Sequence, residues 1–225
     1  GFNGGYQRIT RGAGETTITQ GKAVGATITA RGEGCNDKQK TSGCGKAMIT
    51  IDAIGSGNLA KQGRGINVVI YNDEKNTYES KSFDTYGKKK DVAKMGDFIN
   101  SAQFGEYVIL ACQDECCRQI YGMSKKKQEA NKGVQAMKAL GITGPALCTD
   151  NGRASVNPTE KKRNLFRAGF SSISRKGYGV ISQMYHPRYW SGLPATTTAV
   201  LSSGTGDALQ IVKGKSYLMT MKVRG

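Results

Sequence analysis

The side chains best able to do chemistry in this sequence are basic, and they come in three runs. Lysine and arginine total 33 against 17 acidic residues, a formal net charge of +16. Such an excess is typical of proteins with an anionic partner such as nucleic acid, acidic polysaccharide, membrane or mineral, although it also serves solubility alone. The candidate polyanion-binding residues are Lys88, Lys89, Lys90, Lys125, Lys126, Lys127, Lys161, Lys162 and Arg163.

Cysteine is the second informative residue type, and the even count of 6 favours disulfides. The spacing lacks the paired Cys-x2-Cys or Cys/His sets of zinc sites, so we expect no metal. Adjacent cysteines bridge each other poorly, so Cys116 and Cys117 should reach Cys112, Cys148 or another chain. The best single pair is Cys35 with Cys44, which would close a short polar loop. The candidate disulfide residues are Cys35, Cys44, Cys112, Cys116, Cys117 and Cys148. This pattern predicts a secreted protein in an oxidising, extracellular environment.

Catalytic arrangements find little support in the sequence. The single histidine, His186, excludes a two-histidine metal site and makes a nucleophile–base–acid triad hard to assemble. No Gly-x-Gly pair continues into the Gly-x-Gly-x-x-Gly pattern of phosphate loops. Asp114 and Glu115 are neighbours, and neighbouring strand residues point to opposite faces, whereas the two carboxyls of a glycosidase face each other. We therefore expect no catalytic residue, no cofactor and no enzymatic activity.

Apolar and β-branched patterns predict the elements that must position these residues. Strands are predicted at 16–19, 26–30, 47–52, 63–71, 78–83, 107–112 and 166–173, with a C-terminal hairpin over 209–223. The first two are expected to be joined at Gly21 or Gly25.

Two helices are predicted beside the strands. Apolar residues at i, i+3 and i+7 predict a helix over about 89–100. A second is predicted over about 124–140, with Ser124 as its cap and Gly141 after its end. No apolar run is long enough to span a membrane. The fold class is therefore α+β: a strand-dominated β-sandwich with two packed helices, a β-rich N-terminal arm and a C-terminal hairpin.

Four segments, taken in order, resemble the interleukin-like EMT inducer domain. They are the glycine-arginine-glycine strand start at 63–69, the Phe-Asp-Thr-Tyr tetrad at 83–86, the apolar run into Asp-Glu at 107–115, and 165–167 leading into 173–177. The resemblance covers about residues 27–177. It leaves an N-terminal arm at 1–26 and a β-rich extension at 178–225, which we expect to pack on the same domain.

The resemblance also implies a binding site. The domain forms the non-catalytic, sugar-binding stem of protein O-mannose N-acetylglucosaminyltransferase, where two arginines and an aspartate hold the sugar. The matching positions here are Arg64, Asp114 and Arg167, with Phe166 offering an apolar face. Guanidinium donors and carboxylate acceptors suit vicinal hydroxyls. The competing interpretation is an ion network that locks three strand ends, and Asp84 is expected to cap a turn before the first helix.

The resemblance implies a secreted, lectin-like, non-catalytic protein whose basic surface favours acidic glycans. The alternatives are an extracellular matrix protein that binds polyanions or mineral, and a secreted cytokine-like ligand. Nucleic acid is a weaker option, because the arginine–aromatic motifs of RNA-binding sheets are missing. Tyr185, Tyr189 and Trp190 are residue types found at interface hot spots, so they serve either self-association into a homo-oligomer or the edge of the core.

Overall fold

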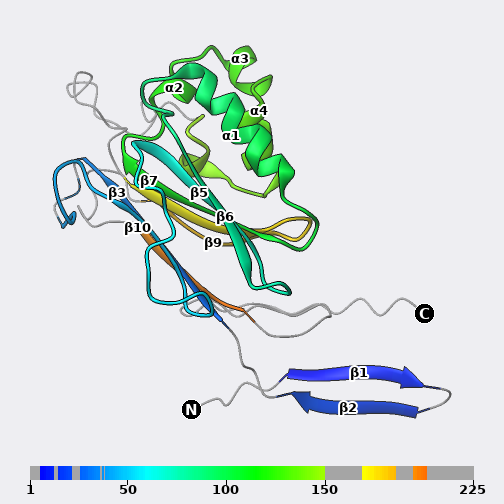
Figure 1. Ribbon diagram of the computed structural model, residues 1–225. Helices are drawn as coiled ribbons and strands as arrows, with labels where there is room; N and C mark the ends of the chain where they lie inside the picture. Colours follow the sequence, from blue (N-terminus) through cyan, green and yellow to red (C-terminus); the bar gives the residue numbers. More distant parts are fainter. Residues whose placement is uncertain are drawn as a thin grey trace.

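The structure, a computed structural model, describes residues 6–12, 15–21, 26–35, 37, 39–149, 169–185 and 195–201. Across these residues the chain forms an eight-stranded mixed sheet with two longer helices packed together (Figure 1). The predicted α+β fold class is confirmed. Within the described ranges, no helix combines the length and apolar character needed to cross a lipid bilayer.

The first two strands form a small sheet of their own. Strand β1 (Tyr6–Gly12) pairs antiparallel with β2 (Glu15–Gly21). Strands are present at both predicted positions in this region, as β2 and as β3 (Thr27–Gly34). They belong to different sheets, however, because β3 pairs with β4, β7 and β10.

The large sheet is organised around β7. Its strands are β3, β4 (Ala47–Ile51), β5 (Gly65–Asn72), β6 (Thr77–Phe83), β7 (Tyr107–Asp114), β8 (Phe170–Arg175), β9 (Gly179–Tyr185) and β10 (Ala195–Val200). Antiparallel pairing joins β6 to β5, β5 to β7, β7 to β8 and β8 to β9. Strand β3 pairs antiparallel with β4 and β10, and its end runs parallel to the end of β7. Strands β9 and β10 lie in the extension predicted to be β-rich, although no strand was predicted at either position.

The helices follow β6 and β7. Helix α1 spans Lys89–Ser101, as predicted, and α2 (Arg118–Tyr121) is an unpredicted single turn. The single helix predicted over 124–140 is wrong: the structure has α3 (Lys125–Glu129) and α4 (Lys132–Ala139). Asn131 separates them, because its side chain accepts hydrogen bonds from two amides and caps α4. Ser124 occupies the N-cap position of α3, as predicted, but its side chain makes no cap hydrogen bond. The short 3-10 helix η1 (Gly144–Leu147) follows.

Helices α1 and α4 approach closely because each presents a glycine to the other. A Cβ at Gly96 would lie 2.4 Å from the carbonyl carbon of Lys132, and a Cβ at Gly133 would lie 2.1 Å from the carbonyl oxygen of Val92. Any larger residue would force the helices apart.

Two apolar clusters lie on opposite faces of β5 and β7. Alternate residues point to alternate faces of a strand. One face packs against the helices and includes Ile66, Val68, Val108, Leu110, Val92, Met95 and Ile99. The other packs against β3 and β4 and includes Val69, Tyr71, Ile109, Ile28, Ala30, Ile49 and Ile51. The central strands are therefore buried on both sides, which gives their ends a rigid base.

Three disulfides use every cysteine of the chain: two lie in the helix-facing cluster, and the third closes the loop between β3 and β4. The predicted Cys35–Cys44 bridge is confirmed. The adjacent cysteines pair as expected, Cys116 with Cys112 and Cys117 with Cys148. The predicted hairpin at 209–223 lies outside the described residues, and the strand predicted from Phe166 is seen from Phe170.

Candidate functional site

Arg64 lies one residue before β5, at the edge of the large sheet where β5 begins and β7 ends. Strands β5 and β6 pair with Ile66 opposite Phe83, so the residues just beyond this register come together. The Arg64 guanidinium forms a two-pronged ion pair with Asp84, with Nε 3.0 Å from Oδ1 and Nη2 2.7 Å from Oδ2. Its side chain is 46% exposed, which leaves the remaining donors accessible to a ligand.

Asp84 caps the turn before α1, as predicted from the sequence. Its Oδ1 accepts from the amide of Gly87 at 2.8 Å, and its carbonyl accepts from the amide of Lys88 at 2.8 Å. Its own amide donates to Oδ2 of Asp91 at 3.2 Å. A Cβ at Gly87 would lie 2.7 Å from both Arg64 Nη2 and Asp84 Oδ2, so the turn packs directly on the ion pair.

The charges of this pair stabilise each other. The hydrogen bond to Asp84 is the main cause that raises the pKa of Arg64, and the nearby Asp114 carboxylate adds to it. The same hydrogen bond from Arg64 lowers the pKa of Asp84. Both groups therefore remain ionised at neutral pH, and Asp114 is close enough to act on Arg64.

Asp114 ends β7 on the same edge of the sheet. Gly65 pairs with Gln113, so Arg64 and Asp114 continue two facing strand ends. Asp114 has a left-handed φ of 67°, and its carbonyl accepts from the amide of Cys35 at 3.1 Å.

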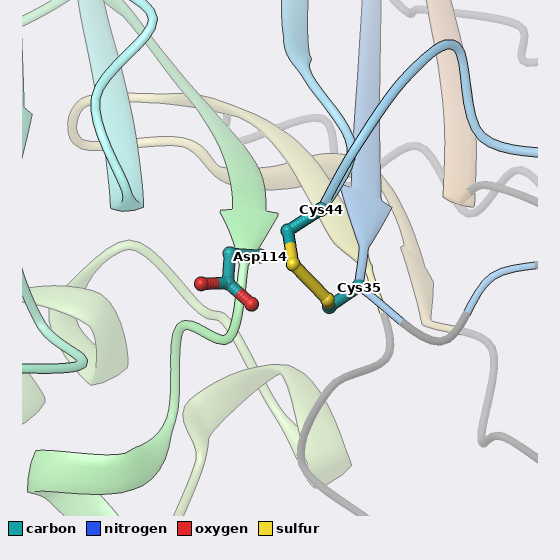
Figure 2. Close-up of side chains that lie close together, drawn as sticks. All are labelled: Cys35, Cys44 and Asp114. Carbon is teal, nitrogen blue, oxygen red and sulfur yellow. A yellow bond between two sulfur atoms is a disulfide. The ribbon is translucent and has the colours of Figure 1, made fainter.

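The Asp114 carboxylate lies beside the Cys35–Cys44 disulfide, as Figure 2 shows. One ligand-type atom from each of these three residues falls within 4.8 Å of the others. The two sulfurs are bonded to each other, so they are not the thiolates that a metal ion would need. The disulfide instead fixes the β3–β4 loop next to the carboxylate.

The structure brings two of the predicted sugar-binding residues, Arg64 and Asp114, to one edge. Arg167 and Phe166 lie outside the described residues, as does the third basic run, Lys161, Lys162 and Arg163. The other two runs are exposed. Lys88, Lys89 and Lys90 lead into α1, and Lys125, Lys126 and Lys127 begin α3.

Two further residues of this edge were missed by the sequence reasoning. The guanidinium carbon of Arg64 lies 4.5 Å from the ring centroid of Tyr86, and that of Arg118 lies 4.8 Å from the same centroid. Tyr86 closes the Phe-Asp-Thr-Tyr tetrad and could have been found there. Arg118 lies 32 positions away in the sequence, and no local pattern connects it to Tyr86.

Taken together, this edge offers fixed guanidinium donors, a carboxylate acceptor and an aromatic ring. These groups suit the binding of a polar ligand with hydroxyl or anionic groups. Glu115, the neighbour of Asp114 in the sequence, is buried, whereas Asp114 is only partly buried.

The fold and the cysteine pairs define a disulfide-bonded α+β domain. Residues 64–146 match the model of the Interleukin-like EMT inducer family, and this part of the chain is such a domain. The family is in general non-catalytic. Three disulfides in a chain that contains such a domain indicate passage through the secretory pathway. No curated protein matches the chain.

Proposed function

We propose that this chain is a secreted, non-catalytic, lectin-like protein that binds a glycan at the edge formed by Arg64 and Asp114. The observation that carries this proposal is the convergence of these two residues at facing strand ends, with the Arg64 guanidinium held by Asp84 and half exposed. A pre-fixed donor set loses little conformational entropy when a ligand binds. In this proposal Arg167 and Phe166 complete the site.

A glycan array tests the proposal, run at low and at physiological salt. Arg64→Ala removes the donors, and Arg64→Lys keeps the charge but removes the forked geometry. Both variants should weaken binding about tenfold or more, because a hydrogen bond from a charged group contributes about 1.5–3 kcal/mol. Lys75→Ala is the matched control: it removes one positive charge from an exposed turn at the opposite end of β5.

Binding to defined sugars that survives physiological salt and is lost in both Arg64 variants supports the proposal. Binding that is equal in wild type, Arg64→Ala and Lys75→Ala would overturn it. In that case Arg64 and Asp84 form only a structural ion pair.

The exposed lysines favour a second candidate, an extracellular protein that binds polyanions or mineral. All six lysines of the first two basic runs are solvent-exposed, at the starts of α1 and α3. Such binding should weaken steeply with salt, because each neutralised anionic group releases a counterion. Replacing Lys125, Lys126 and Lys127 by glutamine should reduce it, whereas Arg64→Ala should not. A cytokine-like role would instead show as cell binding that survives enzymatic removal of glycans.

A further inference from the structure

Tyr86 is the meeting point of two arginines from distant parts of the chain. Arg64 precedes β5 and Arg118 begins α2, and both guanidiniums lie against the Tyr86 ring. Cation–π contact favours each of them over the ring face. Two like charges on one ring nevertheless repel each other, so the arrangement concentrates positive potential at this point.

The two arginines differ in how their charge is balanced. Arg64 is paired with Asp84 through two hydrogen bonds. Arg118 is exposed, and no described carboxylate lies within ion-pair distance of it. The first basic run begins two residues after Tyr86, at Lys88, whose amide closes the turn that contains Tyr86. The uncompensated charge of this edge is thus centred on Arg118.

The backbone of Arg118 is held firmly in place. It directly follows Cys116 and Cys117, which form disulfides with Cys112 and Cys148 respectively. The next residue, Gln119, donates its backbone amide to the carbonyl of Thr85 at 3.0 Å and its side-chain Nε2 to the carbonyl of Tyr86 at 2.9 Å. These two hydrogen bonds attach α2 to the tetrad, and the disulfides attach the residues just before α2 to β7 and to the residue that follows η1. A guanidinium presented in this way is pre-organised for a ligand.

We propose that Arg118 forms an anion subsite beside the Arg64–Asp114 edge and binds the carboxylate or sulfate group of an acidic glycan. The inference rests on the proposed function and adds a substrate class to it. A guanidinium stacked on a ring keeps its N–H donors in its own plane, where they can form two parallel hydrogen bonds to a carboxylate or sulfate. The sugar ring would contact Arg64 and Asp114, and its anionic group would contact Arg118.

Three matched probes test the subsite by calorimetry at fixed ionic strength. They are a hyaluronan hexasaccharide, the same hexasaccharide with its carboxylates reduced to alcohols, and that reduced form carrying sulfate esters. The protein variants are Arg118→Gln, Arg118→Lys and Arg64→Ala. Lys126→Gln is the control, because it removes one exposed positive charge from α3. The thermal midpoint of each variant verifies its fold.

Wild type should bind at least one anionic probe about fivefold to tenfold better than the neutral probe, and the preferred probe identifies carboxylate or sulfate. Arg118→Gln should abolish this preference, because it lowers the affinity for the anionic probe far more than the affinity for the neutral probe. Arg118→Lys should retain only part of the preference, because it lacks the fork. Lys126→Gln should retain it fully.

Absence of any anionic preference, or its persistence in Arg118→Gln, would overturn the subsite. An equal loss in Lys126→Gln would also overturn it, because the preference would then arise from the overall field of the protein. The two proposals fail separately. Binding of the neutral probe that depends on Arg64, with no preference for an anionic probe, would support the glycan site alone. Binding of an anionic probe that depends on Arg118 but not on Arg64 would support the anion subsite alone.

Discussion

Glu33 and Thr41 are joined by two hydrogen bonds, from the Thr41 amide to Oε2 at 2.8 Å and from its hydroxyl to Oε1 at 2.7 Å. The amide of Lys46 adds a third at 2.9 Å, and Arg31 forms an ion pair with the same carboxylate at 2.8 Å. The Glu33 side chain is completely buried. This carboxylate therefore anchors the β3–β4 loop, whose disulfide lies beside the candidate site.

Replacement of Glu33 by glutamine should destabilise the protein. Glutamine has an NH2 group in place of one carboxylate oxygen, and this donor would face other donors instead of an acceptor. The expected cost is about 1–3 kcal/mol in the free energy of unfolding. Denaturant unfolding at pH 7 measures the loss. Glu74→Gln, at an exposed turn position, is the control and should change stability by less than about 0.5 kcal/mol. Equal stability of both variants would contradict the anchoring role.

The same carboxylate predicts a dependence on pH. Burial raises the pKa of Glu33, but hydrogen bonds from Thr41, Lys46 and Arg31 outweigh it and leave the pKa below its usual value. A group whose pKa is lower in the folded state stabilises the protein at pH values above its unfolded-state pKa, which is about 4.3 for glutamate. This stabilisation is lost as the pH falls through the folded-state pKa. The gap in unfolding free energy between wild type and Glu33→Gln should thus be full at pH 7 and shrink below about pH 4. A gap that grows in acid would contradict the assignment.

Asp84→Asn should separate positioning from stability. The Arg64–Asp84 pair is partly exposed, and such pairs contribute only about 0–1 kcal/mol to folding. The thermal midpoint should therefore change little. Glycan affinity should fall about threefold to tenfold, because the Arg64 guanidinium loses its two-pronged anchor. Parallel melting and calorimetric titration with a neutral sugar provide both readouts, and unchanged affinity would show that the pair does not orient the site.

The role of the Asp114 carboxylate is better tested by substitution with asparagine than with alanine. Its φ of 67° suits aspartate and asparagine, whereas alanine in this conformation costs about 1–2 kcal/mol. Asp114→Asn should melt close to wild type and bind a neutral sugar about fivefold more weakly. Asp114→Ala should lose both stability and affinity. Wild-type affinity in Asp114→Asn would remove this carboxylate from the site.

The glycine contact between α1 and α4 predicts a selective loss of stability. A methyl group at Gly133 would overlap the backbone of Val92, so Gly133→Ala should destabilise by about 1–3 kcal/mol despite the better helix propensity of alanine. At Gly57 a Cβ would meet no atom within 4 Å, so Gly57→Ala serves as the control and should be nearly neutral. Denaturant titration distinguishes the two, and a neutral Gly133→Ala would show that the helices can separate at no cost.

The elements set by local pattern could be predicted from the sequence. Val92, Met95 and Ile99 mark α1 by their spacing alone, and all three are buried. The continuous apolar run at 107–112 marks β7 because both faces of that strand are covered. The break between α3 and α4 was missed although Asn131 is a strong cap residue, because the apolar period appeared to continue across it.

The candidate site was only partly predictable for a different reason. The resemblance supplied Arg64 and Asp114, but the partner of Arg64 is Asp84, 20 residues away. That pairing depends on the β5–β6 register, which local sequence does not determine. The contact of Arg118 with Tyr86 depends on two disulfides and a one-turn helix, and pairwise cysteine connectivity cannot be deduced from spacing.

Strand β7 takes its hydrogen-bond partners from both inside and outside the segment that matches the family. Strand β5 lies within residues 64–146, whereas β8 and β3 lie beyond its two ends. A fragment cut at those limits would carry a bare edge along its central strand and an uncovered apolar face, both of which promote aggregation. The segment that matches the family, residues 64–146, is thus smaller than the folding unit. The boundaries of a minimal version of this protein must therefore be chosen from its strand pairings.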